Sequence, residues 1–179
     1  NKNYKLICKQ IKKFKPKIFI ISDQTIFNKV KNKFTNKNIH IINSFENFKI
    51  NFRKSDITIV AIPGIAGLLP TVEMISKSKK MLLANKESIV CGWNLIQKIS
   101  LKSKTKIIPI DSEHFSIMKL LEQDKLNEIK KIYITASGGP FLNYNLSQLK
   151  KVKPHDAIKH PKWKMGKKIS IDSATLMNK

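Results

Sequence analysis

Two acidic residues separated by one residue, Asp111 and Glu113, follow the apolar run Lys106–Ile110 and stand at the start of an amphipathic stretch. If the run is a strand and the stretch a helix, both carboxylates lie at the carboxyl edge of a sheet, where open α/β sheets bind ligands. Carboxylates in this arrangement can reach the same hard divalent cation. The structural alternative, which spacing alone favours, is that Asp111 caps the helix and Glu113 complements its dipole. The neighbouring His114 fits either a ligand or a partly buried core histidine.

Two hydroxyl-bearing segments could hold an anion. The segment Ser137-Gly138-Gly139 directly follows an apolar run, and its glycines let backbone N–H groups approach a ligand while the serine donates to phosphate. Ser173 stands at a predicted helix start, where a hydroxyl and the helix N-terminus together favour an anion. An ordinary turn and a simple N-cap explain these two segments equally well.

Two further segments carry polar or bulky side chains outside any periodic pattern. Asn85-Lys86-Glu87 follows an apolar run, so Lys86 could place its charge over a substrate oxygen, although an exposed lysine in this chain needs no function. His160, Trp163 and Met165 lie in an irregular, proline-bounded segment. Large side chains in such a segment predict a lid over a site, and the alternative is packing on a second core.

Five short β-branched runs alternate with amphipathic stretches and would position these residues. The runs are Lys17–Ser22, Ile39–Asn43, Ile57–Ile62, Lys80–Ala84 and Lys106–Ile110. Continuous apolar character is typical of strands buried on both faces of a parallel sheet. The alternation predicts the α/β class with an open, doubly wound, Rossmann-like parallel sheet. A G-x-G-x-x-G loop is absent, so either no dinucleotide binds or the first βα unit lies before Asn1.

The pattern changes after Ile110. We expect a helix from Ser112 to about Glu122, a strand at Lys131–Thr135, a short strand near Ile169–Ile171 and a helix starting at Asp172. This order of helices and strands indicates the beginning of an α+β domain, with the domain boundary near Asp111.

The composition is that of a globular protein with an unusual charge. The chain has 179 residues and a formal net charge of +23, and Arg53 is its only arginine among 35 basic residues. A lysine-rich nucleic-acid-binding module without catalysis is one interpretation. The lysines are spread along the chain, however, so we favour compositional bias of the coding genome and expect no specific nucleic-acid partner. Cys8 and Cys91 suit a reducing compartment, the cytoplasm, and no apolar run approaches the ~20 residues of a membrane span.

Five ordered segments, spread over more than half of the chain, closely resemble the 1-deoxy-D-xylulose 5-phosphate reductoisomerase family. They are GIAGLLPTVEMI (64–75), LLANKESIV (82–90), PIDSEHFSI (109–117), TASGGPF (135–141) and HPKWKMGKKISIDSATLMNK (160–179). The resemblance implies NADPH-dependent isomerisation and reduction of 1-deoxy-D-xylulose 5-phosphate to 2-C-methyl-D-erythritol 4-phosphate, a step of the non-mevalonate isoprenoid pathway. It also implies a divalent metal (Mn²⁺, Mg²⁺ or Co²⁺) and a homodimer.

The resemblance assigns roles by position. The metal ligands it implies are Asp111 and Glu113. The catalytic residues it implies are Lys86, Asp111, Glu113 and His160. The substrate contacts it implies are Ser112, Glu113, Ser137, His160, Trp163, Ser173, Asn178 and Lys179. The NADPH contacts it implies are Ala61, Ile62, Asn85, Glu87, Met165 and Gly166.

The same resemblance divides the chain into residues 1–111, an NADPH-binding domain lacking its first βα unit, and residues 112–179, the start of the catalytic domain with its flap. The family's glycine-rich cofactor loop would then precede Asn1, and its third metal carboxylate would follow Lys179. We therefore expect a fragment, with weak metal and NADPH binding and little turnover by these residues alone. Pro63 departs from the small residue expected there, which puts one local cofactor contact in doubt but not the fold.

Overall fold

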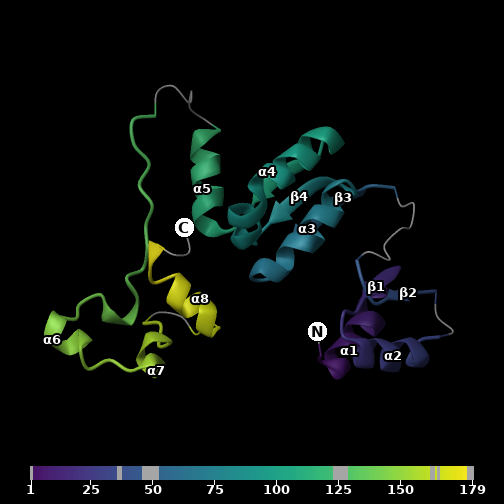
Figure 1. The fold of residues 1–179 in the computed structure, drawn as a ribbon, viewed down its shortest axis with the longest axis horizontal. Helices are drawn as coiled ribbons and strands as arrows, with labels where there is room; N and C mark the ends of the chain where they lie inside the picture. Colours follow the sequence, from purple (N-terminus) through teal and green to yellow (C-terminus); the bar gives the residue numbers. More distant parts are fainter. Residues whose placement is uncertain are drawn as a thin grey trace. The chain divides into compact units, whose positions relative to one another are not determined.

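The computed structural model of the chain describes residues 2–35, 38–45, 53–122, 129–161, 164 and 166–176. The chain divides into two units, Asn1–Ile108 and Pro109–Lys179 (Figure 1). The sequence placed the boundary three residues later, at Asp111.

The first part of the N-terminal unit pairs two helices with a two-stranded parallel sheet. Its elements are α1 (Tyr4–Phe14), β1 (Ile18–Ile20), α2 (Gln24–Lys33) and β2 (His40–Ile42). Asn3 starts α1 by accepting a hydrogen bond from the Leu6 N–H at 3.0 Å. The helices bury one apolar cluster, which contains Ile7, Cys8, Ile11, Ile21, Val30 and Phe34.

A three-stranded sheet in the order β3-β4-β5 follows, with its own helices. The elements are β3 (Ser55–Val60), the 3-10 turn η1 (Ile65–Gly67), α3 (Leu68–Ile75), β4 (Ser78–Leu83), α4 (Lys86–Ser103) and β5 (Lys106–Pro109). β3 and β4 are parallel, and Val60 is the register partner of Leu83. A second cluster contains Val60, Ile75, Met81, Leu83 and Ile96. Because the two strands run in the same direction, the loops that follow them lie at the same edge of the sheet.

The predicted strands and the α/β class with parallel pairing are confirmed. The five strands form two sheets in the described part of the chain, where no pairing joins β1 or β2 to β3. Each sheet packs on its own apolar cluster. The outer face of β3 is open, since Ile57 and Ile59 are 56% and 64% exposed.

The C-terminal unit consists of short helices and extended segments. Its elements are α5 (Ser112–Leu121), the 3-10 turn η3 (Gly139–Phe141), α6 (Leu146–Leu149), α7 (Pro154–Ala157) and α8 (Lys167–Asp172). The predicted helix after Asp111 is confirmed as α5. Of the helices that the structure describes, none combines the length and the apolar composition that a bilayer crossing requires.

Two sequence predictions in this unit are wrong. Lys131–Thr135 is irregular and exposed rather than a strand, because no strand of the described residues supplies it with ladder hydrogen bonds. The predicted strand at Ile169–Ile171 belongs to α8, which ends at Asp172 where a helix was expected to begin. Helical bonding satisfies the backbone there, since the Ser170 N–H donates to the Gly166 carbonyl at 2.9 Å. The alternation of Ile169, Ser170 and Ile171 predicts a strand with its isoleucines buried. In the helix it is Ser170 that is buried, at 1% exposure.

Candidate active site

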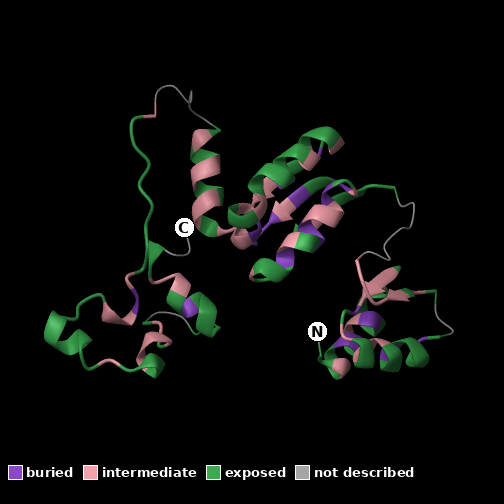
Figure 2. Ribbon diagram, in the orientation of Figure 1, coloured by how far each residue is buried: buried purple, intermediate pink, exposed green. Residues whose placement is uncertain are grey.

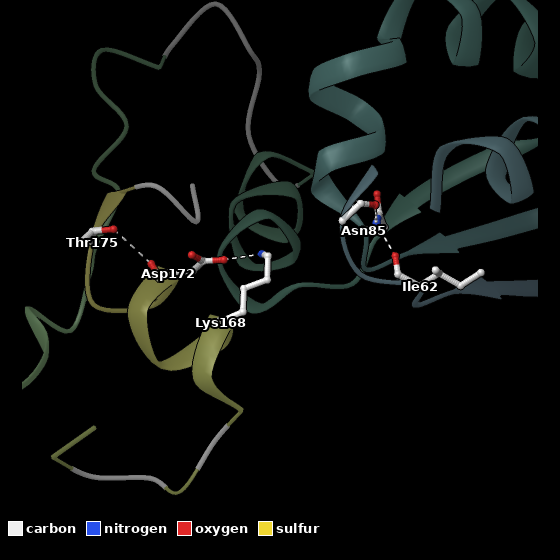
Figure 3. Close-up of polar contacts among 6 residues, drawn as sticks. Ile62, Asn85, Lys168, Asp172 and Thr175 are labelled. Carbon is white, nitrogen blue, oxygen red and sulfur yellow. Dashed lines mark hydrogen bonds and ion pairs between the residues drawn. The ribbon is translucent and has the colours of Figure 1, made fainter. Parts of the chain in front are cut away.

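The loops after β3 and β4 meet at the carboxyl edge of the three-stranded sheet. The Ala84 N–H donates to the Val60 carbonyl at 2.9 Å, so the chain leaves both strands side by side. Asn85 then caps α4, and its Oδ1 accepts a hydrogen bond from the Ser88 N–H at 2.6 Å. The Asn85 carboxamide also donates to the Ile62 carbonyl of the other loop (Figure 3). Residues that the resemblance assigns to NADPH therefore come from two loops held together at this edge.

The other predicted contacts of this edge are accessible. Ala61 and Ile62 are exposed, and Lys86 and Glu87 are half-buried in the first turn of α4. Glu87 is an acid in that turn, where it complements the helix dipole. Lys86 is thus partly buried, and its role stays a prediction.

Asp111 does not cap α5. It occupies the N-cap position in extended backbone, but its side chain makes no capping hydrogen bond. Instead its Oδ2 lies 2.5 Å from Nδ1 of His114, and its side chain is only 16% exposed. The Asp111 side chain therefore pairs with His114 and does not accept a capping hydrogen bond, and its role as a metal ligand stays a prediction. A carboxylate held by an imidazole at a helix start is a hard oxygen donor suited to a divalent cation.

Glu113 and Ser112 stand beside Asp111 in the first turn of α5. The Ser112 hydroxyl donates to Oε2 of Glu113 at 3.0 Å. Among the described residues, no group of three or more histidine, cysteine, aspartate or glutamate side chains could hold a metal ion. The role of Asp111 and Glu113 as metal ligands stays a prediction of the family resemblance.

Three predicted substrate residues meet in the C-terminal unit although 36 positions separate the first from the last. The Ser137 N–H and hydroxyl both approach the Ser173 carbonyl, at 3.3 and 3.2 Å. Nε2 of His160 lies 3.3 Å from the same hydroxyl. The Gly139 N–H donates to the Ser137 hydroxyl at 3.3 Å. This arrangement gathers hydroxyl, imidazole and backbone N–H groups, which are the groups that hold a phosphate.

Two glycines shape the turn next to Ser137. Gly138 and Gly139 have φ of 75° and 63°, the left-handed region that favours glycine. A Cβ on Gly139 would lie 2.5 Å from Cβ of Ala174, so the glycine allows the turn to approach the segment after α8.

The remaining predicted residues are less informative. Gly166 is exposed at the start of α8, and open space surrounds its Cα, so no steric reason requires a glycine there. Trp163, Met165, Asn178 and Lys179 lie outside the described residues.

Sequence reasoning missed two residues. A Cβ on Gly67 would lie 2.6 Å from Nδ2 of Asn85, which is a contact between distant positions that no local pattern reveals. Ser170 was missed because its segment was interpreted as a strand. Its hydroxyl is buried and finds no hydrogen-bond partner in the part of the chain that the structure describes, and the same holds for Ser173 and Ser88.

Comparison with protein families gives matches to both units. The family model described as 1-deoxy-D-xylulose 5-phosphate reductoisomerase matches residues 1–92, and the model of that enzyme's C-terminal domain matches residues 107–179. The chain belongs to the 1-deoxy-D-xylulose 5-phosphate reductoisomerase family. The resemblance inferred from the five ordered segments is thereby confirmed.

Curated relatives support this membership. The reductoisomerase of Pelagibacter ubique is 48% identical over 182 residues, which span 100% of this chain and 47% of that protein. The reductoisomerase of Wolbachia pipientis wMel is 46% identical over 178 residues, spanning 99% of this chain and 45% of that protein. The chain therefore spans about half the length of the curated relatives it matches.

Solved structures of the family share the fold. A reductoisomerase from Zymomonas mobilis in complex with NADPH aligns with a TM-score of 0.82 and 34% identity, over 99% of this chain and 46% of that one. A family structure in complex with NADPH, fosmidomycin and magnesium aligns with a TM-score of 0.78 and 31% identity, over 99% of this chain and 47% of that one.

Proposed function

We propose that the protein carrying this sequence isomerises 1-deoxy-D-xylulose 5-phosphate and reduces the product with NADPH to 2-C-methyl-D-erythritol 4-phosphate, in the non-mevalonate isoprenoid pathway. The observation that carries the proposal is that family models match both units, 1–92 and 107–179, on the segments that hold the predicted site residues.

NADPH is the proposed reductant, and when bound it supplies the hydride. Ala61 and Ile62 after β3, with Asn85 and Glu87 at the start of α4, would line one side of its site. Gly166 before α8 and Met165 are the proposed contacts from the C-terminal unit. Support comes from the relatives of known structure that bind NADPH.

A divalent cation, Mg²⁺, Mn²⁺ or Co²⁺, is the proposed second cofactor, and when bound it acts as a Lewis acid on the substrate's oxygens. The carboxylates of Asp111 and Glu113 would hold it. The contact with His114 fixes the Asp111 carboxylate in one orientation, which lowers the cost of binding. A magnesium-bound relative supports the choice of a hard cation.

The substrate would bind with its phosphate at Ser137 and Ser173, with Asn178 and Lys179 completing that end. His160 lies 3.3 Å from the Ser137 hydroxyl and would cover the phosphate together with Trp163. A family structure with fosmidomycin, a phosphonate, supports an anion-binding role.

The reacting end of the substrate would face two further groups. We assign Ser112 to its hydroxyl groups and Lys86 to charge stabilisation. The hydroxyl of Ser112 donates to Glu113 in this structure. An oxygen of the substrate would replace Glu113 as the acceptor of this hydrogen bond.

The remaining assignments are also proposals. We assign residues 1–111 to NADPH binding and residues 112–179 to the beginning of the catalytic domain. The homodimer is proposed from the family resemblance. The cytoplasm is proposed because Cys8 and Cys91 are free cysteines, which suit a reducing compartment.

The test is the oxidation of NADPH, followed by its absorbance, by purified protein carrying this sequence. We expect oxidation only when 1-deoxy-D-xylulose 5-phosphate and Mg²⁺ are both present, and its loss when the metal is chelated. Activity by residues 1–179 alone equal to that of a full-length relative would overturn the expectation that these residues hold an incomplete site. Absence of NADPH binding together with salt-sensitive, sequence-independent DNA binding would replace the enzyme with a nucleic-acid module.

A further inference from the structure

Asn85 uses its side chain to join two loops at the edge of the three-stranded sheet (Figure 3). Its carboxamide nitrogen donates to the Ile62 carbonyl and, at 2.8 Å, to the Gly64 carbonyl. Its oxygen accepts from the Ser88 N–H at 2.6 Å. A carboxamide has two N–H donors, and both are used by the loop that follows β3.

The side chain has little left to offer a ligand. Asn85 is 2% exposed, so a cofactor could reach the side chain only after the loop moved away. Releasing the two donors would carry a cost, since the carboxamide of Asn85 is buried and would lose both of its hydrogen bonds.

Gly67 leaves the room that this contact requires. A Cβ there would lie 2.6 Å from Nδ2 of Asn85 and 2.6 Å from the Ile62 oxygen. The buried hydroxyl of Thr71 donates to the Gly67 carbonyl at 2.7 Å and fixes this residue in turn. Gly67, Thr71 and Asn85 are thus parts of one packed arrangement, drawn from α3, the turn before it and the start of α4.

We propose that Asn85 is a positioning residue of the cofactor site and not a direct ligand. Its side chain sets the loop Ala61–Gly64 against the first turn of α4, so that groups of both segments face the cofactor together. This inference rests on the proposed function for the identity of the cofactor. It refines the role that the resemblance implies for Asn85, which stays at the edge of the proposed cofactor site while its side chain holds the two loops together.

The first test compares substitutions that separate the donor contacts from the helix cap. Asn85→Asp and Asn85→Ser keep an oxygen that can accept from residue 88, but Asp offers no N–H, and Ser is too short to bridge both carbonyls. We expect both variants to bind NADPH about 10- to 100-fold more weakly in a fluorescence titration, with faster amide hydrogen exchange in residues 61–67. Gly67→Ala should produce the same pair of effects.

A matched control is Asn145→Asp. Asn145 caps α6 and accepts from Gln148 N–H and from the Ser147 hydroxyl, at 2.9 and 2.7 Å. An aspartate can accept both bonds, so we expect no change in NADPH affinity or in exchange. Wild-type affinity and exchange in Asn85→Asp would overturn the proposal.

The second test separates a positioning role from a direct contact and from failure of the proposed function. In NMR spectra the side-chain amide protons of Asn85 should be protected from exchange before NADPH is added. Protection that arises only with NADPH, or a loss of affinity with unchanged exchange in residues 61–67, would show a direct contact. A protein with protected Asn85 protons that binds no NADPH would refute the cofactor while leaving Asn85 as the link between the loops.

Discussion

The two units hold their candidate residues by different means. All the buried hydrophobic side chains of the described residues belong to Asn1–Ile108, where they form two clusters. In the described part of Pro109–Lys179 the buried residues are Gly139 and Ser170 instead. Figure 2 shows buried segments along β4, α3 and α1 of the N-terminal unit.

The difference concerns how precisely a side chain is placed. Asn85 follows β4, and Met81 and Leu83 of that strand lie in the second apolar cluster. Close packing of this cluster fixes the position of the strand end and therefore of Asn85. Ser137 and His160 are held instead by hydrogen bonds of 3.2 to 3.3 Å between exposed or half-exposed groups. Such bonds add little net stability when water competes for them. The edge proposed for the cofactor is therefore fixed by the packed core, whereas the residues proposed for the substrate are held by exposed hydrogen bonds.

The C-terminal unit also keeps apolar surface open. A groove of about 600 Å³ is lined by Ile117 and Leu120 of α5 and by the extended residues Ile129, Ile132 and Tyr133. Tyr133 is 80% exposed. Apolar area left in water contributes nothing to stability, so this unit should open at lower cost than the first.

The largest expected effect comes from removing core volume. Ile96 is fully buried in the second cluster, and Ile96→Ala should lower the free energy of unfolding by about 2–5 kcal/mol. The matched change in the other unit is Leu146→Ala, at a side chain 79% exposed, and it should stay within about 0.5 kcal/mol. Urea unfolding followed by circular dichroism measures both. Equal losses would remove the contrast between the two units.

An intermediate effect is expected at the substrate residues. Ser137→Ala removes the hydroxyl that contacts Ser173 and His160, and it should raise KM for the sugar phosphate about tenfold. The NADPH affinity should not change, because the cofactor edge is packed separately. Ser147→Ala is the control, since its hydroxyl only contacts the Asn145 cap in the same unit. An unchanged KM would exclude Ser137 from phosphate binding.

The smallest effect is acid sensitivity, and it should occur in both units. A hydrogen bond from Lys79 lowers the pKa of Asp56, and a hydrogen bond from Lys159, then one from the Lys153 N–H, lowers the pKa of Asp156. A carboxyl whose folded pKa is lowered stabilises the fold above its unfolded pKa, about 3.9, and loses this contribution as the pH falls through the folded pKa. Asp56 is exposed and Asp156 is partly exposed, so water screens both ion pairs and the change should be slight. Carboxyl NMR titration should show each pKa rising when Lys79 or Lys159 becomes alanine, and a pKa that stays unchanged contradicts the pairing.

The sequence predicted well the elements whose apolar pattern matches their burial. The five strand runs and the helix expected after Asp111, which is α5, are all present in the structure. The pattern failed at Lys131–Thr135 and Ile169–Ile171, where β-branched residues are exposed in the described structure and no neighbouring strand completes a ladder. Strand propensity needs a partner, which a local pattern does not supply.

The candidate site divides in the same way. The family resemblance assigns Ser137, Ser173 and His160 to the substrate, and in the structure Ser137 contacts the other two although the three lie far apart along the chain. The link from Asn85 to Ile62 and Gly64, and the need for Gly67 beside it, could not be predicted, because they depend on the spacing of two parallel strands. The contact of Asp111 with His114 was also not predicted. An aspartate that caps a helix and an aspartate that binds a metal occupy the same place in the sequence, before the first turn of a helix.

The most direct test of the proposed enzyme is the product formed by protein carrying this sequence, with Asp111→Asn as the comparison. Mass spectrometry of a reaction with 1-deoxy-D-xylulose 5-phosphate, NADPH and Mg²⁺ should detect one 2-C-methyl-D-erythritol 4-phosphate for each NADPH oxidised. Asp111→Asn should abolish this product while NADPH binding persists, because an amide is a weaker ligand than a carboxylate for a hard cation. The same yield of product from wild type and Asp111→Asn would contradict the proposed metal site, and no product from either would contradict the proposed reaction.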